Sequence, residues 1–133
     1  MSKFVLDASA LLELLSQEPG AERWAAALND AAISAINLSE VVAKLAESGM
    51  REVEIRGALE PLGIDVVTFD AALAYRAGLL RAQTKRLGFS LGDRACLALG
   101  LQMKLPVLTA DRSWMKLQVG GGDSGDSLDA GVW

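Results

Sequence analysis

Hydrophobic and polar positions along this chain alternate between short apolar runs and longer amphipathic stretches. The apolar runs predict buried strands, which cover residues 4–6, 32–35, 64–67 and 106–109. The amphipathic stretches predict helices, which cover residues 8–15, 21–29, 37–49, 53–62, 70–86 and 90–103, with one more turn at 112–116. Strands that alternate with helices favour right-handed crossovers. The pattern therefore predicts an α/β fold with a mostly parallel sheet and helices on both of its faces.

The end of the chain does not follow this pattern. Residues 120–133 read GGGDSGDSLDAGVW, a Gly/Asp/Ser stretch without periodicity. We expect this tail to be poorly ordered unless Val132 and Trp133 dock on the rest of the protein. The folded domain is then expected to span residues 1–119, with residues 117–119 as the remaining candidate for an edge strand.

Length and cysteine content fit a single domain in a reducing compartment. The chain has 133 residues, enough to bury a core without disulfides. Cys96 is the sole cysteine, so no intrachain bridge is possible. No signal-like start or membrane-length apolar stretch is visible in the sequence. The expectation is a soluble, cytoplasmic protein.

Acidic residues stand at four places where a predicted strand or loop leads into a helix. These are Asp7, Glu40, Asp93 and Asp111, in FVLDASAL, INLSEVVAKL, FSLGDRACLALG and PVLTADRSW. Ligands of parallel sheets bind beyond the carboxyl ends of the strands, where these four residues are expected. Carboxylates gathered at one edge repel one another unless a cation holds them, so the pattern predicts a Mg²⁺ or Mn²⁺ site. The chain has no histidine, so His-ligated zinc and imidazole acid–base chemistry are excluded.

Helix capping is the structural alternative for each of these acids. Asn37 to Glu40 and Ser90 to Asp93 both resemble a capping box, in which an acid lies three residues after a polar cap. Asp7 and Asp111 could be ordinary N-caps of the segments that follow them. Caps are needed at both edges of a sheet, however, and four acids at one edge are more than capping requires.

Two hydroxyl residues lie two positions from two of the acids. Ser9 follows Asp7, and Thr109 precedes Asp111. Either hydroxyl could orient a carboxylate or a metal-bound water from outside the ligand shell. The alternative for both is a local cap on the backbone.

The net charge of −4 argues against a general polyanion binder, because the molecule as a whole does not attract phosphates. Basic residues are nevertheless clustered, since Arg76, Arg81, Lys85 and Arg86 recur at roughly helical spacing. A solvated helix face is the simpler explanation of that cluster. Arg94 and Arg112 each follow an acid directly and are candidates for contact with a phosphate.

Taken together, the four acidic motifs resemble those of the PIN-domain nucleases, most closely the VapC-type toxins of bacterial toxin–antitoxin pairs. The resemblance rests on VLDASALLELL, NLSEVVAKL, SLGDRACLALG and LPVLTADRSW, and it covers residues 3 to about 117. It implies a three-layer α/β/α fold in which Asp7, Glu40, Asp93 and Asp111 form the acidic metal site and carry catalysis. Ser9 and Thr109 fall where the family tends to carry polar residues beside the site. The Gly-rich tail departs from the family pattern.

The same resemblance implies a Mg²⁺- or Mn²⁺-dependent endoribonuclease with a VapB-type antitoxin as partner, and commonly a homodimer. Metal-assisted hydrolysis of RNA would leave a 5′-phosphate and a 3′-hydroxyl. One alternative is a non-catalytic PIN-like module that acts through protein contacts. Another is a response-regulator-like phosphoacceptor, but Leu6 precedes Asp7 where that class would carry a second acid, and Lys104 lies before the last strand rather than after it.

Overall fold

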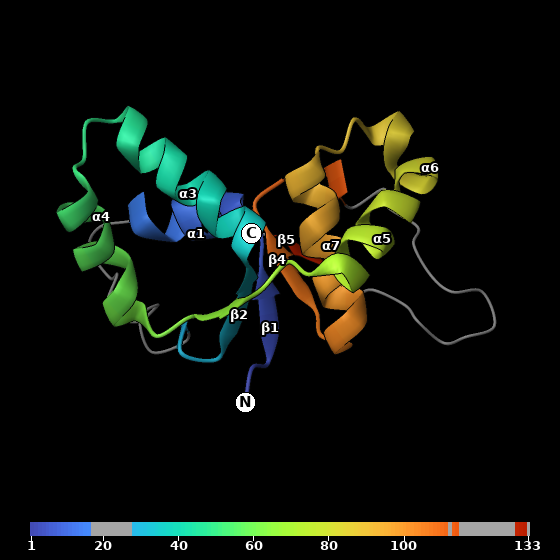
Figure 1. The fold of residues 1–133 in the computed structure, drawn as a ribbon, viewed down its shortest axis with the longest axis horizontal. Helices are drawn as coiled ribbons and strands as arrows, with labels where there is room; N and C mark the ends of the chain where they lie inside the picture. Colours follow the sequence, from blue (N-terminus) through green and yellow to red (C-terminus); the bar gives the residue numbers. More distant parts are fainter. Residues whose placement is uncertain (17–27, 112, 115–129, 133) are drawn as a thin grey trace.

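The computed structural model describes residues 1–16, 28–111, 113–114 and 130–132. Helices and short 3₁₀ turns (η) connect five strands (Figure 1). In chain order the elements are β1 (Phe4–Leu6), α1 (Ala8–Ser16), β2 (Ala31–Ser34), α3 (Ala35–Glu47), α4 (Glu52–Leu59), η1 (Glu60–Leu62), β3 (Asp65–Val67), α5 (Ala71–Leu79), α6 (Arg81–Thr84), η2 (Lys85–Leu87), α7 (Leu91–Met103), β4 (Val107–Thr109) and β5 (Ala130–Val132).

The strands form one sheet in the order β3-β2-β1-β4-β5, and every neighbouring pair is parallel. The chain leaves β1 towards β2 on one side and later returns to β4 on the other side. The direction of winding therefore changes between β1 and β4, which is where an open α/β sheet forms its binding crevice. The predicted α/β class and parallel sheet are confirmed.

Alternate residues of the strands face two separate cores. Val5 and Ala32 pack with α5 and α7 on one face, whereas Leu6 and Ile33 pack with α1 and α3 on the other. Figure 1 shows α1, α3 and α4 on one side of the sheet and α5, α6 and α7 on the other. This period-two alternation produces the three-layer α/β/α arrangement. The described residues contain no helix long and apolar enough to cross a membrane.

Two helices differ from the sequence-based prediction. The single helix expected over residues 70–86 begins after Asp70, as predicted, but it breaks at Leu80 into α5, α6 and η2. The Leu80 carbonyl accepts bonds from Gln83 N (3.1 Å) and Thr84 N (3.1 Å), and also from the buried Thr84 hydroxyl (2.9 Å). This clustering of donors on one carbonyl tightens the chain at the break.

Helix α3 begins earlier than predicted. It follows β2 directly, because Ser34 rather than Asn37 is its N-cap and the Ser34 hydroxyl accepts a bond from Ile36 N. The capping box proposed for Asn37 and Glu40 is therefore wrong, and Glu40 lies in the second turn of the helix. The capping box of Ser90 and Asp93 is present, with both of its hydrogen bonds.

The fifth strand comes from the end of the chain. Ala130–Val132 forms β5 and pairs with β4, with Val132 beside Thr109. These three residues are thus part of the sheet, which is the exception allowed for in the sequence analysis, where a docked Val132 would order the end of the tail. The expectations for residues 17–27, 112, 115–129 and 133, including the possible edge strand at 117–119, lie outside the described residues.

Candidate functional site

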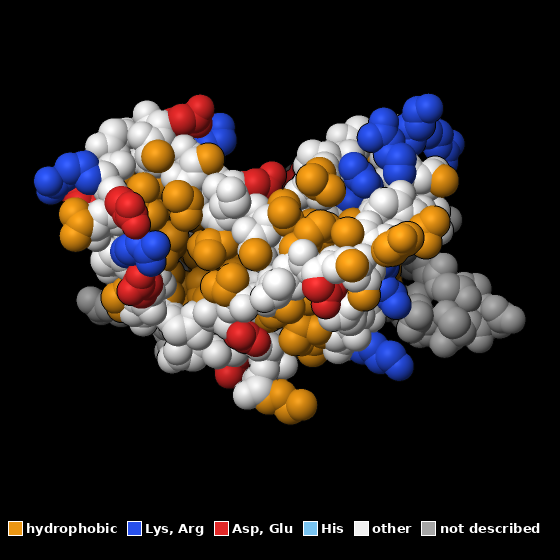
Figure 2. All heavy atoms as spheres, in the orientation of Figure 1, with side chains coloured by type: hydrophobic (Ala, Val, Ile, Leu, Met, Phe, Trp, Pro, Cys, Tyr) orange, Lys and Arg blue, Asp and Glu red, His pale blue; other side chains and the backbone are white. Residues whose placement is uncertain are grey.

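All four acids predicted from the sequence line one pocket at the carboxyl edge of the sheet. The pocket has a volume of about 500 Å³, and Ser9 and Lys44 also line it. Figure 2 shows acidic side chains at the bottom of the notch between α3 and α7. Each acid reaches the pocket from a different element. Asp7 follows β1, Glu40 lies on α3, Asp93 lies in the first turn of α7, and Asp111 follows β4.

Two hydroxyl groups hold the buried carboxylate of Asp7. Its Oδ2 atom accepts a bond from Ser9 Oγ at 2.6 Å and another from Thr109 Oγ1 at 2.8 Å. Each hydroxyl has one proton, which it donates to Asp7 Oδ2. Ser9 Oγ also accepts from Ala110 N at 3.1 Å, and Thr109 Oγ1 accepts from Asp111 N at 3.0 Å. The hydroxyls therefore orient a carboxylate and cap the backbone at once, and they fix β1 to β4.

Asn37 holds Glu40 and links α3 to α7. Its Nδ2 atom donates to Glu40 Oε1 at 2.9 Å and to the Gly92 carbonyl at 3.0 Å. Asn37 is fully buried, and its Oδ1 atom has no hydrogen-bond partner among the described residues. An unsatisfied buried polar atom costs about 1–3 kcal/mol, which a residue used only for packing would avoid. Asn37 is thus a positioning residue for Glu40. From the sequence it was predicted only as a helix cap, a role that Ser34 fills instead.

Gly92 makes room for Glu40. A β-carbon at position 92 would collide with the carboxylate of Glu40. The first turn of α7 can approach α3 this closely because Gly92 has no side chain. Gly92 was not predictable from the sequence, since the need for a glycine there depends on a contact between two distant segments.

Asp93 and Asp111 each use one oxygen to fix the local backbone. Asp93 Oδ2 accepts from Ser90 N at 2.9 Å, as the second half of the capping box. Asp111 Oδ1 accepts from Ser113 N at 2.9 Å and from Ser113 Oγ at 2.7 Å. One oxygen of each of these two carboxylates thus caps the local backbone, as the capping alternative predicted, and the other oxygen does not.

Glu47 also lines the pocket, but it pairs with Lys44. Each of the four acids predicted from the sequence keeps one oxygen without a hydrogen bond from the described residues. These atoms are Asp7 Oδ1, Glu40 Oε2, Asp93 Oδ1 and Asp111 Oδ2. Hard cations such as Mg²⁺ and Mn²⁺ prefer carboxylate oxygens, so the donors fit such an ion. As the side chains stand, no three Asp, Glu, His or Cys groups of the described residues are close enough together to hold a metal. Rotation of the carboxylates would therefore accompany binding.

The pocket opposes the charged form of two acids. Burial raises the pKa of Glu40, the bond from Asn37 lowers it, and the charges of Asp7 and Asp93 raise it again, with a net rise. Burial likewise raises the pKa of Asp93. The hydrogen bonds from Ser90 lower this pKa, the charge of Asp7 raises it, and the net effect is a rise. Like charges held together in this way favour a bound proton or a bound cation.

Cys96 lies below the pocket, in the core around α7. It is fully buried, and burial raises the pKa of its thiol well above the ordinary value. The charges of Asp7, Asp93 and Glu40 raise it further. Cys96 is thus a core thiol within the field of the acidic pocket.

The basic residues near the acids are placed differently from the sequence expectation. Arg94 directs its Nη1 atom to the Ala77 carbonyl on α5, at 3.1 Å, and does not line the pocket. Arg112 lies outside the described residues. Lys44, one turn after Glu40 on α3, lines the pocket and pairs with Glu47 at 3.8 Å. Lys44 was not selected from the sequence, although its spacing of four residues from Glu40 on a helix was a usable signal.

The chain was compared with known proteins and solved structures. None of the curated proteins matches it. DNA-bound VapBC from Salmonella typhimurium has a TM-score of 0.72 at 22% identity, with 98% of each chain covered. VapBC2 from Rickettsia felis, bound to a promoter DNA fragment, has a TM-score of 0.70 at 15% identity, with 96% of this chain and 97% of that chain covered. VapBC-5 from Mycobacterium tuberculosis has a TM-score of 0.58 at 20% identity, with both chains fully covered.

At these identities the solved structures establish the likeness of fold. The family is established by a different comparison, in which the model of the PIN domain matches residues 4–119. That range includes all four acids of the pocket together with Ser9, Asn37, Gly92 and Thr109. The chain belongs to the PIN domain family.

Proposed function

We propose that this chain is a Mg²⁺- or Mn²⁺-dependent endoribonuclease and acts in the cytoplasm as the toxin of a VapBC-type toxin–antitoxin pair. One observation carries the proposal: four carboxylates line a single pocket, and each keeps one oxygen without a hydrogen bond from the described residues. Asp7, Glu40, Asp93 and Asp111 would hold the cation. When bound there, the cation would polarise a phosphate oxygen of RNA and lower the pKa of a water molecule.

The residues of the chain would supply orientation. The two hydroxyls on Asp7 and the amide on Glu40 each hold one oxygen of these carboxylates, so that less movement is needed when the cation and substrate bind. Lys44 extends from α3 at the same pocket and would contact a phosphate of the bound strand. Hydrolysis by water would leave a 5′-phosphate and a 3′-hydroxyl.

The proposed antitoxin partner agrees with an apolar groove on the opposite side of α3. This groove has a volume of about 390 Å³ and includes Leu38, Val42 and Ile55 from α3 and α4. Because α3 carries both the groove and Glu40, a segment bound in the groove would contact the helix that holds Glu40, on the face opposite the acidic pocket. We also propose a homodimer, for which the exposed Tyr75 and Leu79, one turn apart on α5, offer apolar contact area.

Cleavage of RNA by the purified chain tests the function. Single-stranded RNA is incubated with Mg²⁺, with Mn²⁺ or with EDTA, and the new ends are identified by labelling at each terminus. Cleavage that needs the metal, leaves a 5′-phosphate and is absent in Asp7→Asn supports the proposal. Cation binding without cleavage of any RNA would favour the non-catalytic PIN-like module. Cleavage that persists in EDTA would contradict the metal dependence.

A further inference from the structure

Positive charge is concentrated in one segment of this acidic protein. Residues 71–92 contain no Asp or Glu, although they contain Arg76, Arg81, Lys85 and Arg86, in a chain whose net charge is −4. Three of these residues lie together on α6 and η2 and are exposed. Arg81, Lys85 and Arg86 are called the basic surface below. Figure 2 shows a corresponding group of basic side chains over α6.

The basic surface lacks the ion-pair partners that four other basic residues of the protein have. On the β1–α4 side of the molecule, Lys3, Lys44, Arg51 and Arg56 each lie 2.8–3.8 Å from a carboxylate. Among the described residues no Asp or Glu forms an ion pair with the basic surface. Its charge is therefore not neutralised within the described protein, and it can act on a ligand.

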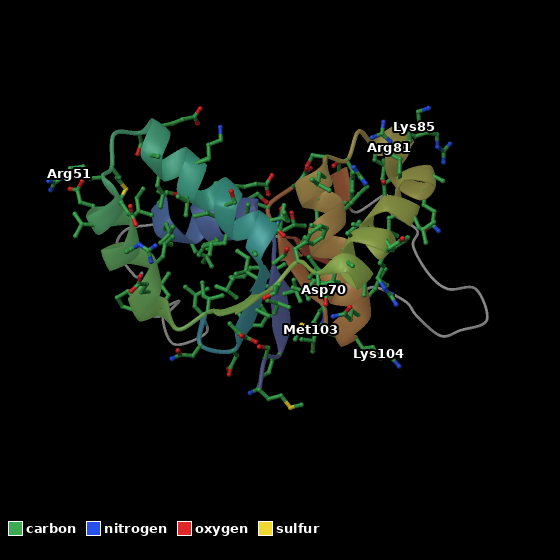
Figure 3. The ribbon with its side chains drawn as sticks, viewed as in Figure 1. Arg51, Asp70, Arg81, Lys85, Met103 and Lys104 are labelled. Atoms are coloured by element: carbon green, nitrogen blue, oxygen red, sulfur yellow. The ribbon has the colours of Figure 1, made fainter. Side chains whose placement is uncertain are left out.

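The basic surface lies at the same edge of the molecule as the acidic pocket. η2 leads through Gly88 and Phe89 into Ser90, the N-cap of α7, and the first turn of α7 carries Asp93. Figure 1 shows α6 at the upper right, above α5, with the chain running from there to the start of α7 at the notch, and Figure 3 labels Arg81 and Lys85 at this upper edge. A strand that enters the pocket and continues past the start of α7 would reach these residues.

An acidic pocket that cleaves a polyanion needs attraction from elsewhere on the surface. Before a cation is bound, the four carboxylates repel phosphates, the positive charge of Lys44 is paired with Glu47, and the net charge of −4 gives no general attraction. We propose that Arg81, Lys85 and Arg86 bind the phosphates of the single-stranded RNA next to the bond that is cleaved. This inference rests on the proposed ribonuclease function and assigns the surface that holds its substrate. RNA is favoured over an acidic protein because the basic surface and the pocket share one edge, along which a single strand can contact both.

The test measures RNA binding and cleavage separately. Binding of a fluorescent single-stranded RNA is measured against salt concentration in the Asp7→Asn chain, which retains the RNA during the measurement. The triple change Arg81→Gln, Lys85→Gln and Arg86→Gln is then added. Each phosphate contact to a single strand contributes about 0.7 to the slope of log Kd against log salt, so loss of three contacts should reduce the slope by about 2. An unchanged slope would overturn the proposal.

A matched control removes three charges elsewhere. Lys3→Gln, Arg51→Gln and Lys104→Gln have the same effect on net charge, and Figure 3 shows Arg51 and Lys104 well away from the basic surface. We expect the control to change the slope by much less than the triple variant. Equal effects of both sets would mean that only net charge matters, which contradicts a specific surface.

Cleavage distinguishes failure of this inference from failure of the function. With Asp7 intact, the triple variant should lose at least about tenfold in kcat/KM on long RNA, while it cleaves a dinucleotide that cannot reach the surface as fast as wild type. If the wild-type chain cleaves RNA but the triple variant keeps the salt slope, the nuclease function is supported and the proposed RNA-binding surface is wrong. Weaker binding of poly-glutamate with unchanged RNA binding would assign the surface to an acidic protein instead.

Discussion

The carboxylate of Glu40 occupies the space that a side chain at Gly92 would need. These residues are 52 positions apart in the chain, on α3 and α7, and Asn37 joins both by hydrogen bonds to Glu40 Oε1 and the Gly92 carbonyl. The contact between the two helices thus serves to place a carboxylate rather than to bury an apolar surface. Stability and activity should therefore respond differently to changes at this contact.

Gly92→Ala should reduce RNA cleavage without unfolding the protein. The clash falls on the end of the flexible Glu40 side chain, which can move, so the cost appears in the site rather than in the fold. Replacement of a helical glycine by alanine also favours the helix by up to about 1 kcal/mol. Thermal melts and cleavage rates of Gly92→Ala and Gly57→Ala provide the comparison, because a β-carbon at Gly57 meets no atom within 4 Å. Equal activity of both variants would show that the position of Glu40 is unimportant.

Asp7→Asn should abolish cleavage and leave the melting temperature unchanged or raised. The asparagine oxygen can still accept the bonds from Ser9 and Thr109, so the change removes a charge and a ligand while the local geometry is kept. We expect cleavage to fall by more than about 100-fold, since even residues outside the ligand shell cost 10–100-fold. Asp65→Asn on β3, an exposed acid outside the pocket, is the control and should cleave normally. A variant that melts well below wild type would indicate a structural role for Asp7.

Without metal, the pocket should make the protein less stable as the pH rises. The pKa values of Glu40 and Asp93 are raised on folding, so the folded protein binds their protons more tightly than the unfolded chain does. Their contribution to stability is full below the unfolded values near pH 4 and is lost as the pH rises through the folded values. Urea unfolding in EDTA, between about pH 4 and pH 7, compares wild type with Glu40→Gln/Asp93→Asn. The stability of the double variant relative to wild type should increase with pH, and a constant difference would contradict the effect.

Divalent cations should restore this stability. An ion that binds only the folded chain stabilises it by about 1.4 kcal/mol at ten times its dissociation constant. Melting temperatures with Mg²⁺ and with Mn²⁺ should exceed those in EDTA for wild type, and the increase should be largely lost in Asp7→Asn. K⁺ at the same ionic strength controls for screening of charge. The site would not be a metal site if all salts had equal effects.

Removal of β5 should loosen β4 and, through it, the site. Val132 pairs with Thr109, whose hydroxyl holds Asp7, so a chain that ends at residue 129 leaves one edge of β4 unpaired. We expect a lower melting temperature and faster amide exchange at Val107–Thr109, measured by hydrogen exchange, together with weaker cleavage. Exchange rates equal to those of the full chain would show that β4 does not need this partner.

The sequence predicted the features that depend on local pattern. Apolar runs located four strands, and the position of Asp7, Asp93 and Asp111 after strands or at the start of a helix placed them at the carboxyl edge. The winding change between β1 and β4 also followed from the alternation of elements, once these two strands were assumed to be neighbours.

Features that depend on contacts between distant segments were not predictable in this way. Ser34 and Asn37 are both good caps, and the choice of Ser34 depends on where β2 ends in the sheet. The role of Gly92 depends on the approach of α7 to α3. β5 has the sequence Ala-Gly-Val and follows a Gly-rich segment, so it contains no apolar run like those of the other strands and becomes recognisable through its pairing with β4.

The rate at which a thiol reagent modifies Cys96 would report how often the structure around the site opens. A thiolate attacks a thiol reagent and displaces its leaving group, whereas the Cys96 thiol is fully buried, and burial and the nearby acids raise its pKa. Modification must then wait until α7 separates from the sheet, so its rate counts these openings in the unmodified protein. Since the chain has no other cysteine, the absorbance of the group released from the reagent would follow the opening, with no residue replaced.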